Sequence, residues 1–304
     1  MDRFTSLIQQ LKQTVPGLEL RENEPMKSHT TFRIGGPARL MALPKNRQEA
    51  IAAVRAARVL GIAPFFLGNG SDLLVSDQGY DGFILKTAGL DGLESTEGGL
   101  RAESGLLLAR VANAALDLGL TGLEFAHGIP GSLGGGVSMN AGAYGGELVQ
   151  VLTAVTFLDG QGDVQTLPAR ECQLTYRHSL FSDHPEYLIL AAQFALTPGD
   201  QGVIKARMEE LIQKRREKQP LELPSAGSTF KRPEGHFAAA LIQECGLKGV
   251  GIGGAQVSEK HSGFVVNRGG ATADDVRRLM SLIQETVLRE TGVVLEPEVK
   301  FLGF

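Results

Sequence analysis

The sequence predicts an α+β protein in which a larger N-terminal part is followed by a smaller C-terminal part. Three observations support this fold class. Residues 47–60 are rich in Ala with apolar residues at helical spacing, which indicates a helix. The apolar segment 64–67 follows them and reads as a short strand. Residues 151–158 and 164–167 flank a turn rich in Asp and Gly, which is typical of a β-hairpin.

The individual elements follow from periodicity and from stop signals. Helical spacing predicts an N-terminal helix that contains Phe4 and Leu11, and further helices at 47–60, 106–118, 201–219, 237–244 and 272–291. Apolar runs predict strands at 64–67, 82–86, 151–158, 164–167, 187–196, 263–267 and 299–302. The glycine-rich residues 127–145 are expected to form a long loop, and Pro198-Gly199-Asp200 marks the boundary between the two parts.

Composition restricts the class of protein. The chain has 304 residues, of which 42% are hydrophobic, and its formal net charge of −4 argues against a general nucleic-acid or membrane-surface binder. The longest strongly apolar stretch, 187–196, is too short to span a bilayer, and the charged N-terminal helix does not resemble a signal peptide. We therefore expect a cytoplasmic protein. Cys172 and Cys245 form no Cys-x-x-Cys motif, so we expect two reduced buried thiols and no metal site.

Two glycine-rich segments are candidates for binding a diphosphate. One is Gly68-Asn69-Gly70-Ser71, which follows a predicted strand, and the other is residues 128–136 with Ser132. Consecutive backbone N–H groups in such turns form a concave anion site, and glycine has no Cβ to block a ligand. Either segment alone could be purely structural, but two of them in one domain favour nucleotide binding.

A third glycine-rich segment, residues 249–254, matches the spacing G-x-G-x-x-G but is not expected to bind a dinucleotide. Such a site requires a strand before the glycines and a helix after them, whereas a predicted helix precedes this segment. The chain also contains no G-x-x-x-x-G-K-[ST] segment, which argues against chemistry driven by ATP.

Four separated groups of motifs extend in order over nearly the whole chain. They are Thr30-Thr31-Phe32-Arg33-Ile34-Gly35-Gly36 with Gly68-Asn69-Gly70-Ser71; Gly128-Ile129-Pro130-Gly131-Ser132 with Met139-Asn140-Ala141-Gly142-Ala143-Tyr144-Gly145; Tyr176-Arg177-His178-Ser179 with Phe181; and Gly227-Ser228-Thr229-Phe230-Lys231 with Leu295-Glu296-Pro297-Glu298-Val299. Together they resemble the UDP-N-acetylenolpyruvoylglucosamine reductase family, and the ordered set is far more specific than any single motif.

The resemblance implies a fold and a cofactor. The family is similar in fold to flavoproteins of the vanillyl-alcohol-oxidase type, in which non-covalent FAD lies between two α/β subdomains. By this resemblance residues 1–198 form the FAD-binding domain, with subdomains at about 20–87 and 88–198, and residues 199–304 form an α+β substrate-binding domain that closes over the substrate. The FAD-binding residues would be Gly68, Asn69, Gly70, Ser71, Asp72, Gly128, Ile129, Pro130, Gly131, Ser132, Gly134 and Gly135.

The resemblance also implies a reaction, in which NADPH reduces FAD and FAD reduces UDP-N-acetylglucosamine enolpyruvate to UDP-N-acetylmuramate for peptidoglycan synthesis. This substrate is a vinyl ether conjugated to a carboxylate, so it needs a cation at the carboxylate and a proton donor at carbon. Arg177 suits the first task, with Glu298 nearby, and Ser228 would be the donor. Taken singly, Arg177 could be a surface ion pair, Glu298 a solvated carboxylate and Ser228 part of a turn. We expect the three to converge on one cavity beside the flavin.

The chain looks like the shorter, second type of the family, because little room exists between Lys231 and Val257 for the extra loops of the first type. Arg232 also stands where the first type has Asn after its Phe-Lys pair. The resemblance assigns contacts to the UDP-sugar to Arg215, Lys218, Lys231, Arg232 and His261. Arg215 and Lys218 could instead lie on a solvated helix face.

Two other functions remain open on the sequence. One is a different FAD enzyme of the same fold, such as a hydroxy-acid or sugar-lactone dehydrogenase, because a fold does not fix a substrate. The other is a nucleotide-binding module without catalysis, which would show no flavin colour. For the reductase we expect the UDP-sugar and NADPH as ligands, no nucleic-acid partner, and a monomer or weak dimer.

Overall fold

The computed structural model describes residues 2–304 and confirms the alternation of helices and strands. A four-stranded sheet has the order β1-β2-β5-β3, with bounds Glu19–Pro25, Pro37–Leu43, Tyr80–Lys86 and Pro64–Leu67. The predicted helix at 47–60 is α2 (Arg47–Val59). The Asn46 side chain caps its start by accepting from the Glu49 N–H at 2.9 Å, and Gly61 follows its end with a φ of 66°.

The chain divides into two compact units. The first unit contains the chain up to Asn23, Leu40–Asn69 and Gly82–Gln213, and the second contains Glu24–Arg39, Gly70–Asp81 and Lys214–Phe304. The long helix α6 (Gln201–Lys218) begins in the first unit. These two units are defined by how compactly their residues pack, which does not by itself mark a domain boundary. The predicted boundary after residue 198 therefore stays a prediction.

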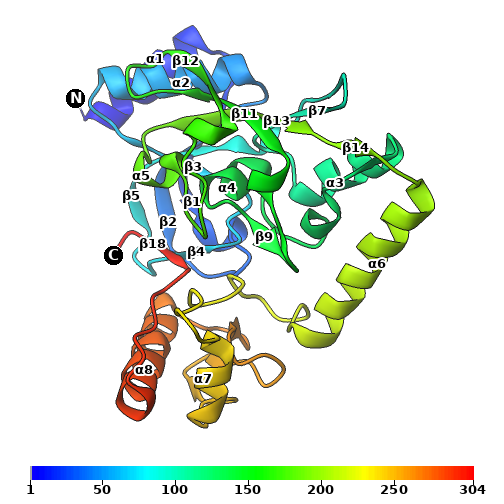
Figure 1. Ribbon diagram of the computed structural model, residues 1–304. Helices are drawn as coiled ribbons and strands as arrows, with labels where there is room; N and C mark the ends of the chain where they lie inside the picture. Colours follow the sequence, from blue (N-terminus) through cyan, green and yellow to red (C-terminus); the bar gives the residue numbers. More distant parts are fainter. Residues whose placement is uncertain (1) are drawn as a thin grey trace. The chain divides into compact units, whose positions relative to one another are not determined.

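The first unit is built around a five-stranded antiparallel sheet of order β12-β11-β13-β7-β6, of which Figure 1 labels the first four strands. Their bounds are Val164–Pro168, Leu152–Leu158, Leu188–Ala195, Gly99–Glu103 and Leu93–Thr96. The helices α3 (Leu108–Asp117), α4 (Leu133–Ser138) and α5 (Leu180–Asp183) contribute buried side chains to the same core. A second core lies between α1 (Arg3–Thr14) and α2, where Leu7, Leu11 and Val54 are fully buried.

The expectation of a long loop at 127–145 is wrong, because α4 lies inside it. Leu133 and Val137 are one helical turn apart and both are fully buried, so their burial outweighs the poor helix propensity of the three glycines between them. Those glycines also permit close packing, since a Cβ on Gly136 would lie 3.0 Å from the Leu108 side chain. After α4, β9 (Gly142–Ala143) and β10 (Gly146–Glu147) form a short hairpin.

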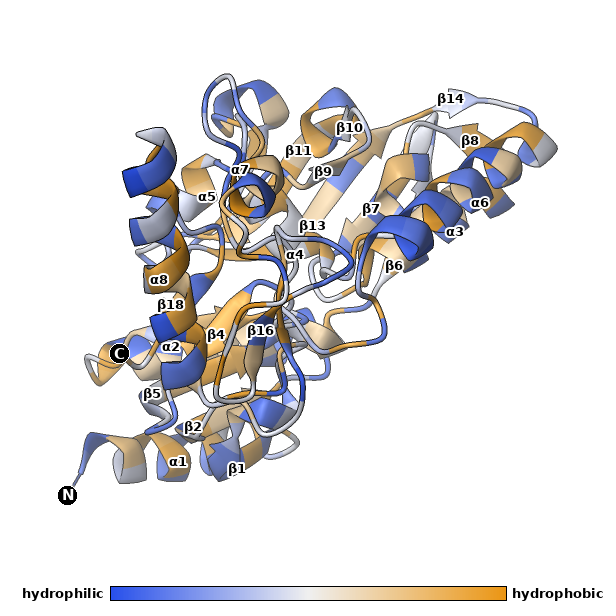
Figure 2. Cartoon of the chain, turned by 90° about the horizontal axis from the view of Figure 1, so that it is seen from below, coloured by the Kyte–Doolittle hydropathy of each residue, from blue (hydrophilic) through white to orange (hydrophobic). Residues whose placement is uncertain are grey.

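The second unit contains two helices, α7 (Ala238–Glu244) and α8 (Ala273–Thr291), and a three-stranded antiparallel sheet of order β15-β16-β17. The strands are Gly251–Ile252, Ala255–Val257 and Val265–Asn267. Residues 249–254 lie at the start of a β-hairpin, whereas a dinucleotide site would have a helix after its glycines. Figure 2 shows a hydrophobic stripe along α8, which corresponds to the buried residues Val276, Leu279, Met280, Ile283 and Val287.

The C-terminal strand β18 (Lys300–Leu302) pairs in parallel with β4 (Leu73–Val75), which directly follows the first glycine-rich segment. No helix within residues 2–304 is both long and apolar enough to cross a membrane. In the same described part of the chain, His, Cys, Asp and Glu side chains do not gather in threes at a possible metal position.

Candidate active site

The two glycine-rich segments meet within the first unit. A Cβ on Gly68 would lie 2.1 Å from the Ser132 Oγ, so a larger residue at this position would force the Ser132 side chain to move. The Asn69 side-chain amide donates to the Pro130 carbonyl and holds the two segments together. Gly68 and Asn69 therefore contact the second glycine-rich segment, and the binding of FAD by the two segments stays a prediction.

Backbone hydrogen bonds to residues 104–108 hold the second glycine-rich segment in place. The N–H groups of Leu133 and Gly134 donate to the carbonyls of Leu106 and Ser104 at 2.7 and 2.8 Å. The hydroxyls of Ser104 and Ser132 are buried and have no hydrogen-bond partner among the described residues, and the same holds for the Nδ1 atom of His127. Buried polar atoms are normally bonded. Unpaired groups beside a glycine cradle fit a polar ligand such as a diphosphate.

His127 immediately precedes this segment, and its burial lowers its pKa from the ordinary value for histidine. The imidazole is therefore neutral at pH 7, and a neutral ring carries one acceptor nitrogen. Neither His127 nor Ser104 belongs to a recognisable motif, so the sequence alone does not mark either as a functional residue.

Gly70, Ser71 and Asp72 belong to the second unit and are anchored there. Gly70 has a φ of 62°, and a Cβ on it would lie 2.2 Å from the His29 carbonyl oxygen. The N–H of Thr31 donates to the Gly70 carbonyl at 3.0 Å, and the N–H of Lys300 donates to the Asp72 carbonyl at 3.1 Å.

Arg177 occupies a tight turn in the first unit. Thr175 and His178 exchange backbone hydrogen bonds of 3.1 and 3.2 Å, so Tyr176 and Arg177 are its central residues. Arg177 has a φ of 54°, in the left-handed region that favours glycine. Its Nη2 donates to the Gly142 carbonyl at 3.4 Å, and its guanidinium lies 5.1 Å from the centre of the Tyr176 ring. This conformation costs a residue with a Cβ about 1 to 2 kcal/mol, so the surrounding contacts must hold Arg177 in it.

Two buried polar residues support this turn. Asn140 is 1% exposed, and its amide donates to the carbonyl of Thr175 and to the Glu147 carboxylate, both at 3.1 Å. The fully buried Ser179 donates from its hydroxyl to the Ser138 carbonyl at 2.7 Å. Segments 138–145 and 175–179, which contain two of the recognised motifs, are thus bonded to each other.

Ser228 and Glu298 lie close together in the second unit. Ser228 is exposed and follows Gly227, whose φ is 77°. The next residue, Thr229, accepts from the N–H of Glu298 at 2.9 Å and donates its own N–H to the Gly263 carbonyl at 2.9 Å. The backbone hydrogen bonds of Thr229 therefore hold the segments of Ser228 and Glu298, two of the three predicted catalytic residues, next to each other. Arg177 belongs to the other unit, so the convergence of all three stays a prediction.

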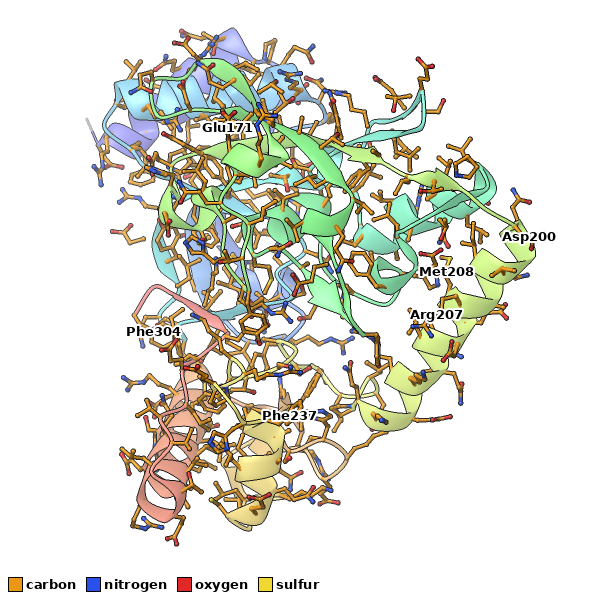
Figure 3. The ribbon with its side chains drawn as sticks, viewed as in Figure 1. Glu171, Asp200, Arg207, Met208, Phe237 and Phe304 are labelled. Atoms are coloured by element: carbon orange, nitrogen blue, oxygen red, sulfur yellow. The ribbon has the colours of Figure 1, made fainter. Side chains whose placement is uncertain are left out.

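The predicted substrate residues have specific surroundings in the second unit. Lys231 pairs with Glu296 at 3.4 Å. The Arg232 guanidinium lies 4.4 Å from the centre of the Phe237 ring. Phe237, which is labelled in Figure 3, directly precedes α7. Burial lowers the pKa of His261, and the positive charges of Lys248 and Lys218 lower it further. Lys218 and His261 are therefore within electrostatic reach of each other.

The two cysteines differ in burial. Cys172 is fully buried, which raises the pKa of its thiol to about 11, so this part of the expectation is confirmed. Cys245, which follows the C-terminal end of α7, is only partly buried, so the expectation of two buried thiols is wrong for this residue. Both thiols are free.

Comparison with known proteins gives the family. The model of the UDP-N-acetylenolpyruvoylglucosamine reductase C-terminal domain matches residues 219–302, and the model of an FAD binding domain matches residues 38–168. The UDP-N-acetylenolpyruvoylglucosamine reductase of Agathobacter rectalis is 48% identical to this chain, over 98% of both chains. That of Caldanaerobacter subterraneus subsp. tengcongensis is 47% identical, again over 98% of both. The chain belongs to the UDP-N-acetylenolpyruvoylglucosamine reductase family.

A solved structure agrees with this membership. The crystal structure of the family's enzyme from Thermus caldophilus matches with a TM-score of 0.79 and 32% identity, over 94% of this chain and 99% of that one. The chain is thus an FAD-dependent oxidoreductase, and the predicted fold class, an α+β FAD-binding domain followed by a C-terminal domain of this family, is confirmed. The glycine contact between Gly68 and Ser132 and the unpaired hydroxyls beside it fit FAD.

Proposed function

We propose that this enzyme uses NADPH to reduce UDP-N-acetylglucosamine enolpyruvate to UDP-N-acetylmuramate in cytoplasmic peptidoglycan precursor synthesis. Membership of the reductase family supports the substrate. The observation that carries the proposal is the exposed Ser228 on a segment whose next residue is bonded to the backbone of Glu298. A hydroxyl and a carboxyl on backbone segments that are bonded to each other suit the protonation of a carbon next to a carboxylate.

The reaction adds two electrons and two protons, as one hydride and one proton, across the carbon–carbon double bond of the enolpyruvyl group. FAD, when bound and reduced by NADPH, would supply the hydride for the terminal carbon. The electron pair of the double bond moves toward the carboxylate, and the adjacent carbon then takes a proton. Gly68, Asn69 and Ser132, with Gly128, Ile129, Pro130, Gly131, Gly134, Gly135 and residues 70–72, would hold the cofactor.

Arg177 would bind the substrate carboxylate and stabilise the negative charge that develops on it. Its guanidinium is permanently charged and can make two parallel hydrogen bonds to a carboxylate. The left-handed backbone of Arg177 and its ring contact with Tyr176 restrict the side chain before substrate binds. Less conformational entropy is then lost on binding.

Ser228 would donate the proton, and Glu298 would act at the same carboxylate. A serine hydroxyl is a weak acid, so it works only at a fixed position beside a charged or hydrogen-bonding group. The backbone bonds of Thr229 to Gly263 and Glu298 fix that position on one side of Ser228. Lys231 is engaged with Glu296, and we assign it to substrate binding together with Arg232, Arg215, Lys218 and His261.

Lys218 and His261 would hold the diphosphate of the UDP-sugar. A phosphate needs a cation and hydrogen-bond donors, and His261 is neutral at pH 7 because burial and two lysines lower its pKa. The neutral ring accepts from the N–H of Gly263 through Nδ1 at 3.2 Å, which leaves Nε2 as the donor.

The two half-reactions of the FAD-loaded enzyme test this function separately. In a stopped-flow experiment, NADPH alone is expected to bleach the flavin absorbance of both the wild type and Ser228→Ala. The enolpyruvyl UDP-sugar is then expected to restore the colour of the wild type. In Ser228→Ala this step should slow by about 10² to 10⁴-fold, the usual effect of removing a positioned proton donor.

Ser225→Ala is the matched control, because it removes a hydroxyl three residues away and keeps the backbone carbonyl that accepts from Thr31. It should leave both half-reactions near wild type. Loss of flavin bleaching with intact reoxidation in Ser228→Ala would contradict the role of Ser228. A wild-type enzyme that the enolpyruvyl UDP-sugar cannot reoxidise would contradict the proposed substrate.

A further inference from the structure

Thr31 joins the glycine-rich segment at Gly70 to the segment that carries Ser228. We propose that Thr31 is a positioning residue for proton transfer, and that its hydroxyl holds the start of the Ser228 segment in place. This inference rests on the proposed function. Thr31, Gly70 and Ser225 all belong to the second unit.

The hydrogen bonds of Thr31 point in two directions. Its N–H donates to the Gly70 carbonyl at 3.0 Å, and its Oγ1 donates to the Ser225 carbonyl at 2.6 Å. The Oγ1 also lies 3.5 Å from the Gly70 carbonyl, but a hydroxyl has only one proton. The hydroxyl therefore donates its proton in the shorter contact. The Thr31 side chain bonds to Ser225, and the Thr31 backbone bonds to Gly70.

The segment Ser225–Thr229 is held unequally at its two ends. At Thr229 the backbone N–H donates to Gly263, the carbonyl accepts from Glu298, and the Oγ1 accepts from the N–H of Val265 at 2.9 Å. At Ser225 the backbone bridges Val266, and Thr31 supplies the only side chain bonded to it among the described residues. Ser228 lies between these ends beside Gly227, so its position depends on both.

The bond from Thr31 is too weak to decide the fold but strong enough to set a position. A single hydrogen bond contributes about 1 kcal/mol to stability. Catalysis is far more sensitive, because a misplacement of about 1 Å can cost roughly 10²-fold in rate. Since Ser225 keeps its backbone bridge to Val266, we expect loss of the hydroxyl to shift Ser228 rather than release it. The expected effect on proton transfer is about 10-fold.

The neighbouring threonine provides a matched control. The Thr30 hydroxyl donates to the Ile34 carbonyl at 3.1 Å, so its bond stays inside its own turn and does not reach Ser225. Thr30 is 7% exposed, and Val has nearly the same shape as Thr. Thr30→Val and Thr31→Val therefore remove the same group from adjacent positions, but only the second removes a bond to the Ser228 segment.

The experiment compares Thr31→Val, Thr31→Ser and Thr30→Val as FAD-loaded enzymes, with each half-reaction followed by stopped flow and the thermal midpoint measured in parallel. We expect Thr31→Val to slow flavin reoxidation by the enolpyruvyl UDP-sugar about 10-fold, while NADPH bleaches the flavin within about 2-fold of wild type. Thr31→Ser keeps the hydroxyl and should restore reoxidation. Thr30→Val should lower the thermal midpoint without separating the half-reactions.

Equal losses in both half-reactions of Thr31→Val, or the same pattern in Thr30→Val, would show that Thr31 acts only through stability. Unchanged reoxidation in Thr31→Val would refute the positioning role directly. If Thr31→Val does not fold, Thr31→Ala repeats the comparison without the second methyl group. These outcomes are distinct from failure of the proposed function, in which the enolpyruvyl UDP-sugar would not reoxidise the wild type either.

Discussion

The turns that carry Arg177 and Ser228 differ in which residue takes the left-handed backbone conformation. Both need a residue in the left-handed region of backbone conformation. In the first turn Arg177 itself takes that conformation, with a φ of 54°. In the second, Gly227 takes it with a φ of 77°, and Ser228 is the next residue. One proposed catalytic residue thus bears the backbone strain, and the other has a glycine beside it that bears none.

The difference teaches how each side chain is held in place. Arg177 is restrained by its own backbone, by the Tyr176 ring and by the Gly142 carbonyl. Ser228 has a short side chain with one rotatable bond to its oxygen, so its position is set by the hydrogen bonds of its neighbours. Substitution of Arg177 should therefore separate activity from stability, whereas substitution beside Ser228 should change both.

The largest effect is expected for Arg177→Gly. Loss of the guanidinium should lower kcat/KM for the enolpyruvyl UDP-sugar by about 10² to 10³-fold, as for other groups that stabilise developing charge. Stability should change by less than about 1 kcal/mol, because relief of the left-handed strain offsets the entropy of glycine and the lost contact. Steady-state kinetics and denaturant unfolding measure the two quantities.

Arg177→Ala separates strain from the loss of the side chain. It removes the same guanidinium but keeps a Cβ in the left-handed region, so it should be less stable than Arg177→Gly by about 1 kcal/mol. Equal stability of the two variants would mean that the strain in the turn is no larger than the entropy cost of glycine, and the contrast with Gly227 would fail.

Much of the fold was predictable because its signals are local. The helix at 47–60 and the hairpin around 159–162 depend on spacing, caps and turn residues within a few positions. The pairing of β4 with β18 was not predicted, since each has three residues and they lie more than two hundred positions apart. Nothing in so short a segment specifies a distant partner. Helix α4 was missed because propensity argues against its glycines, and only tertiary burial of Leu133 and Val137 explains it.

The candidate site divides in the same way. Gly68 and Ser132 could be named from sequence because glycine clusters are visible as such. The left-handed Arg177 could not be anticipated, since arginine gives no sign of this conformation. Thr31 stood inside a recognised motif, but its bond to Ser225 joins positions 194 residues apart, and no spacing rule predicts that.

An intermediate effect is expected for Gly227→Ala. A Cβ there would lie 4.0 Å from the Ser71 carbonyl oxygen, which is an ordinary contact, so the cost comes from the backbone alone. The left-handed conformation should cost about 1 to 2 kcal/mol, and partial relaxation should slow reoxidation of the flavin by the enolpyruvyl UDP-sugar about 10-fold. Gly61→Ala is the control, because Gly61 has a φ of 66° and open space around it. Gly61→Ala should lose a similar amount of stability while the rates of both half-reactions stay unchanged. Slow reoxidation of the flavin in Gly61→Ala would show that lost stability alone impairs the enzyme.

The smallest effect is expected for Tyr176→Leu, which tests whether the ring holds the Arg177 guanidinium. Tyr176 is 47% exposed, so its contact with the guanidinium at 5.1 Å contributes about 0.5 to 1 kcal/mol. That energy corresponds to a rise of about 2- to 5-fold in KM for the enolpyruvyl UDP-sugar with little change in kcat, because the ring pre-positions a group that the substrate would otherwise have to order. Tyr176→Phe keeps the ring and should match the wild type. If Tyr176→Phe weakens binding as much as Tyr176→Leu, the tyrosine acts through its hydroxyl, and the backbone of Arg177 alone restrains the guanidinium.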